Sequence, residues 1–316
     1  MPDPGCYAHA DRASNDNDPD LIDRKNHLDT LAICALLILC ASWGAQQVAI
    51  KMVVADVSPV MQGVIRSAGA TMLVSLWVTL KGERVFVRDG TLWWGITAGV
   101  LFGVEFLLVY WGLAHTNASR AIIFVYMSPF VVAIGSQLFV PGEGLNRIQF
   151  VGLGIAFAGI LIAFGESLTL PSREMLFGDA LTICAAIFWG ATTVVVRAGP
   201  LAEIAPARTL LYQLGVSVPI LLLGSVALGE PGIVDLSPLA IGSLAFQTVW
   251  IASVTYLAWF WLIRHYPAPK IASFTFLAPL FGVIAGWLVL DEPITAALLA
   301  ALVLVGSGVY LVNKKR

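Results

Sequence analysis

The sequence predicts an all-α integral membrane protein with ten transmembrane helices, built as two inverted five-helix repeats. The first reason is composition: of 316 residues, 58 % are apolar and only 12 % are charged, against roughly 25 % charged residues in a soluble domain. The second is a series of ten apolar segments near the length of about 20 residues that crosses a bilayer. The third is a set of motifs that occurs once in each half. The net charge of −2 gives no indication of a nucleic-acid partner.

The apolar segments are separated by short connections rich in Gly, Pro, Asn and charged residues, which leave no room for a separate soluble domain. Residues 1–28 are polar and charged and are expected to form a disordered cytoplasmic tail. The four cysteines and four histidines show no spacing of a disulfide framework or metal site, so no cofactor or metal is expected. The predicted spans are 30–54, 58–80, 91–114, 118–140, 147–165, 178–198, 205–228, 236–263, 268–290 and 294–312.

Lysine and arginine predict the orientation of these spans. With the N-terminus inside, 14 of the 18 basic residues fall on the inner side and three on the outer side, and Arg66 remains within the membrane. Cytoplasmic connections of membrane proteins carry such an excess. Both termini are therefore predicted to be cytoplasmic.

The two halves agree at ordered positions. The phrase "WGAQQVAIK" (43–51) returns as "WGATTVVVR" (189–197), and "YWGLAHTNASRAIIFVYMSPF" (110–130) aligns with "FWLIRHYPAPKIASFTFLAPL" (260–280). Each half holds five spans, so the second half must enter the membrane from the opposite side. Inverted repeats are common in secondary transporters, which bind substrate near the midplane between the repeats. The predicted repeat domains are residues 29–170 and 171–316.

The same segments resemble the drug/metabolite transporter superfamily, and within it the ten-helix exporters with two EamA repeats. The resemblance rests on "WG" early in the first and sixth spans, on "SPF…LFVPGEGLNRIQFVGLGIAFAGILIA", and on "APLFGVIAGWLVLDEPITAALLAALVLVGSGVYLV". Glu143 and Glu292, before the last helix of each repeat, belong to the pattern, although the first repeat departs from it with "PGEGLN". The resemblance covers residues 30–312 and looks most like the aromatic amino acid exporter branch.

The resemblance implies a bacterial inner membrane protein that exports metabolites, often amino acids, or drugs, by alternating access without ATP. Its expected partners are the lipid bilayer and a small-molecule substrate. Proton coupling and the choice between a monomer and a homodimer stay open.

Two ionisable residues within the apolar slab are the first candidates for transport, because charged groups there are costly and usually functional. Arg66 and Glu105 lie about 12 Å and about 13 to 14 Å below the same surface, at 1.5 Å per residue. They are expected to face a shared interior and to pair directly or through water. The pair could bind a zwitterion, Glu105 alone could couple transport to protons, or the pair could simply lock two helices together. The equivalents in the second repeat are Gln213 and Thr255.

Aromatic and amide side chains near the middle of the spans are further candidates for an amphipathic cavity, although packing alone also explains each of them. Pro129 and Pro279 are expected to kink their spans and act as hinges, with Gly135 and Gly282 allowing close packing and bending. The remaining candidate substrate-binding residues are Trp43, Gln46, Tyr110, Tyr126, Trp189, Thr192, Gln213, Gln247, Trp250, Tyr256 and Phe276.

Two other functions compete with amino acid export. A sugar-phosphate or nucleotide-sugar exchanger should show clustered Lys and Arg in its cavity, and only Arg66 lies deep. A lipid-modifying membrane enzyme would need a nucleophile or paired carboxylates near a surface. Glu143, Asp291 and Glu292 are expected near the outer surface, in equivalent turns that suit a structural role. Lys51 and Arg197 are expected at opposite surfaces, where basic side chains can snorkel.

Overall fold

The computed structural model describes residues 24–85, 87–165, 170–291 and 295–314. The regular elements across these residues are helices, and the one isolated bridge between extended residues joins Val57 to Ile233. The elements are α1 (Thr30–Met52), α2 (Pro59–Leu80), α3 (Leu92–Leu113), α4 (Ala118–Val125), α5 (Ser128–Phe139), α6 (Arg147–Phe164), α7 (Arg173–Ala198), η2 (Pro200–Ala202), α8 (Pro206–Ala227), α9 (Pro238–Ala245), η3 (Phe246–Thr255), α10 (Tyr256–His265), α11 (Ala268–Phe274), α12 (Leu277–Leu290) and α13 (Ala296–Asn313).

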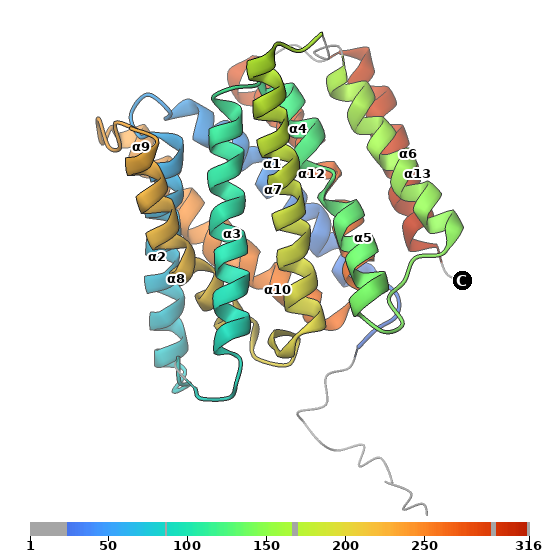
Figure 1. The fold of residues 1–316 in the computed structure, drawn as a ribbon, viewed down its shortest axis with the longest axis horizontal. Helices are drawn as coiled ribbons and strands as arrows, with labels where there is room; N and C mark the ends of the chain where they lie inside the picture. The colour runs from blue at the N-terminus through green and yellow to red at the C-terminus, as the bar shows by residue number, and fades with distance from the viewer. Residues whose placement is uncertain (1–23, 86, 166–169, 292–294, 315–316) are drawn as a thin grey trace, which may run out of the picture.

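Within the described residues, these elements form ten helical segments that are long and apolar enough to cross a membrane. Figure 1 shows how the helices are arranged in the bundle. Their ends agree with the predicted spans to within a few residues, so the ten-helix membrane fold is confirmed. The largest difference is α7, which begins at Arg173 because the Ser172 hydroxyl accepts a hydrogen bond from the backbone of Met175 and caps the helix. Proline starts α2, α8 and α9, where its missing N–H has no helical partner to lose.

Two spans are broken in the middle. The fourth span consists of α4 and α5, which are separated at Tyr126 and Met127, and the ninth consists of α11 and α12. Pro129 and Pro279 each fall in the first turn of the helix that follows the break. A proline lacks the N–H that would continue the preceding helix, so each proline ends one helix and starts the next.

The two glycines predicted beside these breaks lie at close helix contacts. A Cβ atom on Gly135 would come within 2.6 Å of Val194 Cγ2, and one on Gly44 would come within 2.5 Å of the Gly282 nitrogen. Both glycines lie inside regular helices, α5 and α12. They allow α5 to approach α7 and α12 to approach α1, as small residues do in membrane helices.

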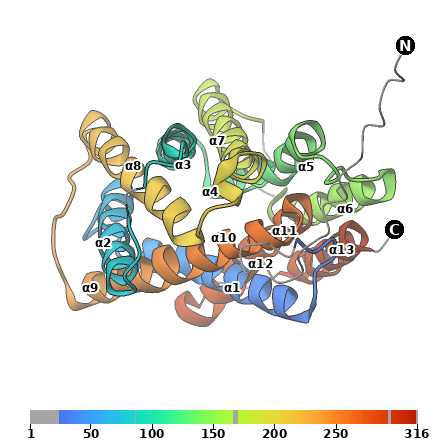
Figure 2. The same ribbon diagram turned by 90° about the horizontal axis from the view of Figure 1, so that it is seen from below.

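Helix packing follows the same scheme in both halves. The first span, α1, packs along α12 of the ninth, and the sixth span, α7, packs along α5 of the fourth. The fifth and tenth spans, α6 and α13, pack against each other at one edge of the bundle, as both Figure 1 and Figure 2 show. Of the other spans, α3 packs against α7 and α8, and α8 also packs against α2.

The described ends of the chain lie at one end of the bundle, which we call the terminal end. The Lys25 N–H donates to the His265 carbonyl at 2.8 Å, and Asn313 Nδ2 donates to Ser273 Oγ at 3.3 Å. Of the tail predicted to be disordered, Lys25 and Asn26 make hydrogen bonds to the second half of the chain, and residues 1–23 lie outside the described residues.

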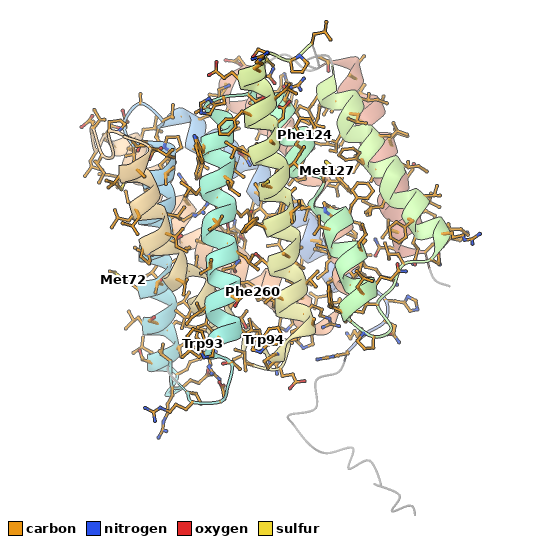
Figure 3. All side chains as sticks on the ribbon, viewed as in Figure 1. Met72, Trp93, Trp94, Phe124, Met127 and Phe260 are labelled. Carbon is orange, nitrogen blue, oxygen red and sulfur yellow. The ribbon has the colours of Figure 1, made fainter. Side chains whose placement is uncertain are left out.

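The outer surface of the bundle is apolar. Met72 and Trp93 are 72 % and 74 % exposed, and Figure 3 shows both pointing away from the helices. Trp93 and Trp94 lie at the start of α3, near the terminal end, as expected of tryptophans at a membrane interface. Such a surface would be insoluble in water, so the protein is an integral membrane protein.

Candidate functional site

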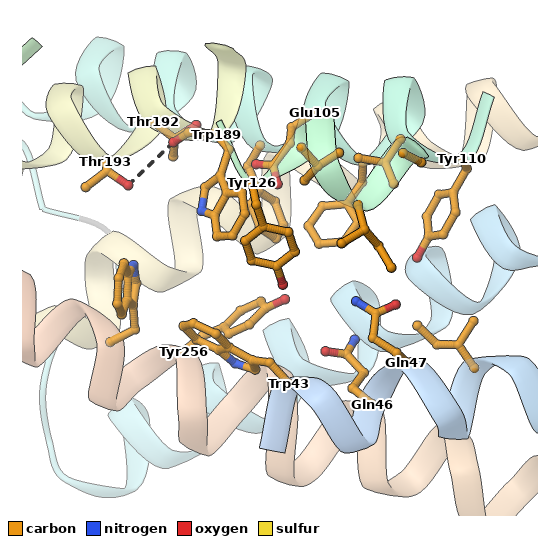
Figure 4. Close-up of a pocket in the computed structure, with 18 of the residues that line it drawn as sticks. Trp43, Gln46, Gln47, Glu105, Tyr110, Tyr126, Trp189, Thr192, Thr193 and Tyr256 are labelled. Atoms are coloured by element: carbon orange, nitrogen blue, oxygen red, sulfur yellow. Dashed lines mark hydrogen bonds between the residues drawn. The ribbon is translucent and has the colours of Figure 1, made fainter. Parts of the chain in front are cut away.

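A cavity of about 340 Å³ lies between the two halves of the chain and is shown in Figure 4. The first half contributes α1, α3, α4 and the first residue of α2, and the second half contributes α7, α8 and α10. Nine candidates predicted from the sequence meet here: Trp43, Gln46, Glu105, Tyr110, Tyr126, Trp189, Thr192, Gln213 and Tyr256.

Helical periodicity explains why these side chains share one space. Residues at i, i+3, i+4 and i+7 occupy one face of a helix, and four helices turn such a face to the cavity. The lining residues with this spacing are Trp43, Gln46, Gln47 and Ile50 in α1; Phe102, Glu105, Phe106 and Val109 in α3; Ala118, Ala121, Ile122 and Val125 in α4; and Tyr256, Trp259, Phe260 and Ile263 in α10.

The cavity wall is largely aromatic. The Trp43 ring meets those of Tyr256 and Trp259 edge to face, with centroids 6.4 Å and 5.3 Å apart. Across the space, Tyr126 and Trp189 form a similar pair at 5.7 Å. The Trp43 indole N–H donates to Thr255 Oγ1 at 3.1 Å, which fixes the ring. These contacts make a preformed wall suited to the apolar or aromatic part of a small molecule.

Glu105 and Arg66 lie on the two sides of this wall. Glu105 lines the cavity and is 6 % exposed, whereas Arg66 is fully buried and is absent from the lining. The Arg66 guanidinium carbon lies 4.5 Å from the centroid of the Phe106 ring and 5.9 Å from that of Tyr256. None of its three side-chain nitrogens has a hydrogen-bond partner, and Glu105 Oε2 has none either. The expected direct pair is therefore not formed.

Three predicted residues lie elsewhere. Gln247 is buried and donates to Gln62 Oε1 at 2.8 Å and to Ser243 Oγ at 3.1 Å. Trp250 is 41 % exposed on the outside of the bundle. Phe276 is fully buried among other aromatic rings, with the Phe130 centroid 6.4 Å away. None of the three lines the cavity.

Sequence reasoning missed several lining residues. Trp259 follows Tyr256 by three positions, and Phe106 and Phe102 flank Glu105 at adjacent and i−3 positions on α3. The helical spacing from a residue already chosen was the available signal. Among the described residues, no group of three or more His, Cys, Asp or Glu could hold a metal ion.

The cavity is accessible at one end and closed at the other. At the end farther from the termini, its lining includes Leu113, the last residue of α3, and Ala118, the first of α4, and both are exposed. We call this the open end. Toward the terminal end, the lining residues Phe260 and Ile263 are only 5 % and 1 % exposed. A small molecule could therefore enter from one side only in this conformation.

A buried cluster of charges lies directly beyond the closed end. Arg197, at the end of α7, donates from Nε to Glu143 Oε1 at 2.6 Å and from Nη1 to the carbonyls of Ile263 and Arg264 at 2.6 Å and 2.9 Å. Arg197 Nη2 also pairs with Glu143, whose Oε2 accepts the Ala268 N–H at 3.0 Å. The Arg197 and Glu143 side chains are 3 % and 9 % exposed.

This cluster corrects two expectations. Arg197 does not snorkel to a surface, because its guanidinium is buried and fully occupied by acceptors. Glu143 lies at the terminal end rather than near the outer surface, because it accepts a hydrogen bond from Ala268. Ala268 begins the ninth span, and Asp291 directly follows the other end of that span. Glu143 and Asp291 therefore lie at opposite ends of the bundle. The turns that contain Glu143 and Asp291 were expected at one surface because they are equivalent in the two repeats. Sequence similarity between turns does not say on which side of the membrane each turn lies. Glu292 lies outside the described residues.

Comparison with known proteins agrees with this architecture. The model of the EamA-like transporter family matches residues 30–165 and again 176–314. The uncharacterized transporter YoaV of Bacillus subtilis (strain 168) is 23 % identical over 270 residues, which are 85 % of this chain and 92 % of YoaV. A probable amino-acid metabolite efflux pump of Escherichia coli (strain K12) is 26 % identical over 288 residues, covering 88 % of this chain and 93 % of the pump.

A solved crystal structure shares the fold. It is 14 % identical in sequence, superposes with a TM-score of 0.76, and the match covers 90 % of this chain and 96 % of the other. The family model occurs twice and spans most of the sequence. The chain therefore belongs to the EamA-like transporter family.

Proposed function

We propose that this protein is a secondary transporter that exports small amphipathic metabolites, chiefly amino acids, by alternating access around the central cavity. The observation that carries the proposal is a cavity between two repeats, aromatic and amide-lined, and accessible from one end only. Its volume of about 340 Å³ falls in the range of roughly 300–1,000 Å³ typical of small-molecule sites. In the proposed setting, a bacterial inner membrane, both termini are cytoplasmic and the open end faces outward.

The arrangement of the helices supports alternating access. The family model matches each half once, and contacts of the first half recur in the second with the partners exchanged, as in α1 with α12 and α7 with α5. An inverted repeat of this kind gives a transporter two nearly equivalent states, related by rocking of one repeat against the other.

Amino acids suit the site better than sugar phosphates do. No Lys, Arg or His occurs among the described residues that line the cavity, whereas a phosphate group would call for several. The aromatic wall suits an apolar side chain, which favours aromatic and hydrophobic amino acids. The similarity to a probable amino-acid metabolite efflux pump of Escherichia coli (strain K12) points the same way.

Transport into reconstituted vesicles tests the proposal. Aromatic amino acids, sugar phosphates and organic cations would be offered with and without a pH gradient, and we expect the amino acids to move. Trp43→Ala should lower the flux because Trp43 lines the cavity, whereas Trp93→Ala, a tryptophan on the outer surface, should not. Failure of every solute to move under any gradient would overturn the proposal.

A further inference from the structure

The charge that faces the cavity has one sign. Its described lining contains one carboxylate, Glu105, and no Lys, Arg or His. The neighbouring positive charge, Arg66, is fully buried and lies behind the rings of Phe106 and Tyr256, at 4.5 Å and 5.9 Å. Arg66 and Glu105 therefore form a separated pair of charges that presents its negative end to the cavity.

The surroundings of Glu105 strengthen this preference. Aromatic rings carry negative potential on their faces and attract cations. Six of the lining residues are Trp or Tyr: Trp43, Tyr110, Tyr126, Trp189, Tyr256 and Trp259. A substrate carboxylate would meet only neutral donors here, such as the amides of Gln46, Gln47 and Gln213. An ammonium group would meet Glu105, whose Oε2 has no partner.

We propose that the site recognises its substrate through the ammonium group, and that a substrate carboxylate is dispensable. The substrate class is then primary amines with an aromatic or apolar body, of which amino acids are one kind. This inference rests on the proposed function, because it assumes that the cavity is the substrate site. It differs from recognition of a zwitterion, in which Arg66 would take the carboxylate.

Three compounds that share a phenyl group separate these alternatives: phenylalanine, phenethylamine and 3-phenylpropionate. Their binding to the full-length protein in detergent can be followed by tryptophan fluorescence, because Trp43, Trp189 and Trp259 line the cavity. We expect phenethylamine to bind at least as tightly as phenylalanine. We expect 3-phenylpropionate to bind at least about tenfold more weakly, since it lacks the charged donor that would hydrogen-bond to Glu105. Glu105→Gln should remove the advantage of the amine, whereas the binding of 3-phenylpropionate, which gains nothing from Glu105, should not weaken.

The outcomes are distinguishable from failure of the proposed function. Equal binding of phenylalanine and 3-phenylpropionate, or phenethylamine binding that Glu105→Gln leaves unchanged, would overturn ammonium recognition even if amino acids are transported. Vesicles that move no solute, with ammonium-selective binding intact, would instead overturn the transport proposal.

A second inference comes from a different observation, the buried cluster beyond the closed end. It joins three segments: Glu143 lies between α5 and α6, Arg197 ends α7, and Ile263 to Ala268 connect α10 to α11. The carbonyls that accept from Arg197 end α10, where the helix dipole favours a cation. The Ala268 N–H that donates to Glu143 belongs to the first residue of α11.

Arg197 also lies on the cavity-facing side of α7. It follows Thr193 by four residues and Trp189 by eight, and both of these line the cavity. Its acceptor Ile263 is itself a lining residue. The cluster therefore lies directly between the cavity and the terminal end.

We infer that the Glu143–Arg197 cluster is the gate of the terminal end, which must separate each time the cavity opens to that side. Breaking one partner of a buried ion pair is strongly unfavourable, so the intact cluster stabilises the conformation that is open at the other end. Glu143 and Arg197 are thus gating residues and need not touch the substrate.

Thiol labelling measures the gate directly. In a chain whose four natural cysteines are replaced by alanine, Thr193→Cys places one thiol at the cavity wall. A membrane-impermeant reagent is applied to vesicles from the terminal face. We expect Glu143→Gln to raise the labelling rate at least about tenfold, because loss of one charge weakens the closed arrangement.

A second buried pair supplies the matched control. Arg120 and Asp179 are both 6 % exposed and join the starts of α4 and α7, at the open end. Asp179→Asn removes a comparable charge pair and should leave labelling from the terminal face unchanged. A labelling rate that neither Glu143→Gln nor Arg197→Ala raises, in protein that still elutes as a folded species, would overturn the gate. A rise with Asp179→Asn equal to that with Glu143→Gln would also overturn it, since the effect would then be general loosening.

Discussion

Arg66 and Arg197 are both buried arginines, yet their surroundings are opposite. Every nitrogen of the Arg197 guanidinium has an acceptor, provided by Glu143 and two carbonyls. No side-chain nitrogen of Arg66 has one, and aromatic rings cover it instead. A fully satisfied buried charge holds segments together, whereas an unsatisfied one costs stability and is retained for what its charge does to a neighbour. We therefore assign Arg197 to closure and Arg66 to the electrostatics of Glu105.

The largest expected effect comes from removing Arg197. Arg197→Ala leaves Glu143 buried without its charge partner, and we expect the free energy of unfolding to fall by about 3–5 kcal/mol. Thermal unfolding in detergent measures this. Arg197→Lys keeps the charge but loses the forked geometry of arginine, so its effect should be intermediate. A loss below about 1 kcal/mol for Arg197→Ala, the range of exposed pairs, would erase the contrast with Arg66.

The next effect concerns transport rather than stability. Glu105→Gln removes the only carboxylate that lines the described cavity, and we expect amino acid flux to fall about tenfold or more, as for loss of one charge-assisted hydrogen bond. Flux measured with and without a pH gradient also tests Glu105 as a coupling site. Transport by the variant that retains the full dependence on the gradient would remove that role from Glu105 and leave only substrate binding.

Arg66→Met tests the same comparison by removing the arginine that has no hydrogen-bond partner. The change loses a cation–π contact of about 1–2 kcal/mol but also removes a buried group without hydrogen bonds, which costs about 1–3 kcal/mol. We expect the free energy of unfolding to change by less than about 1 kcal/mol, far less than for Arg197→Ala, while amine binding weakens or changes its selectivity. A destabilisation as large as that of Arg197→Ala would show instead that Arg66 locks its helices together.

The smallest expected effect concerns the ion pair between Asp89 and Arg208 near the surface. The Thr91 hydroxyl and the Arg208 guanidinium, which lies 2.5 Å from Asp89 Oδ2, hold the pKa of Asp89 at about 2, below its ordinary 3.8. Because the pKa is lowered in the folded state, this contribution is present above pH 3.8 and is lost as the pH falls to about 2. Asp89→Asn should remove it at a cost below about 1 kcal/mol, measured as thermal stability between pH 6 and pH 3. A larger loss would make this loop pair comparable to the buried ones.

Much of the candidate site could be predicted because helical spacing is a local property. Trp43 and Gln46, or Trp189 and Thr192, share a helix face whatever the neighbouring helices are. Gln247 and Phe276 could not be placed in the same way. Both occur mid-span, but Gln247 faces Gln62 and Phe276 faces Phe130. In a membrane bundle, an apolar helix face can meet lipid, a neighbouring helix or the cavity. Helical periodicity shows which residues share a face, but it does not show which of these three environments the face meets.

The sequence by itself determined the membrane class, the ten spans and the breaks at Pro129 and Pro279, because hydrophobicity, span length and the missing proline N–H act within a few residues of chain. Only the tertiary structure decided that Arg66 lies behind the cavity wall and that Glu143 meets Arg197, 54 positions away. Those contacts depend on how helices from both halves pack. A charge buried in a membrane protein takes its role from the partners that packing provides, and those partners are distant in the chain.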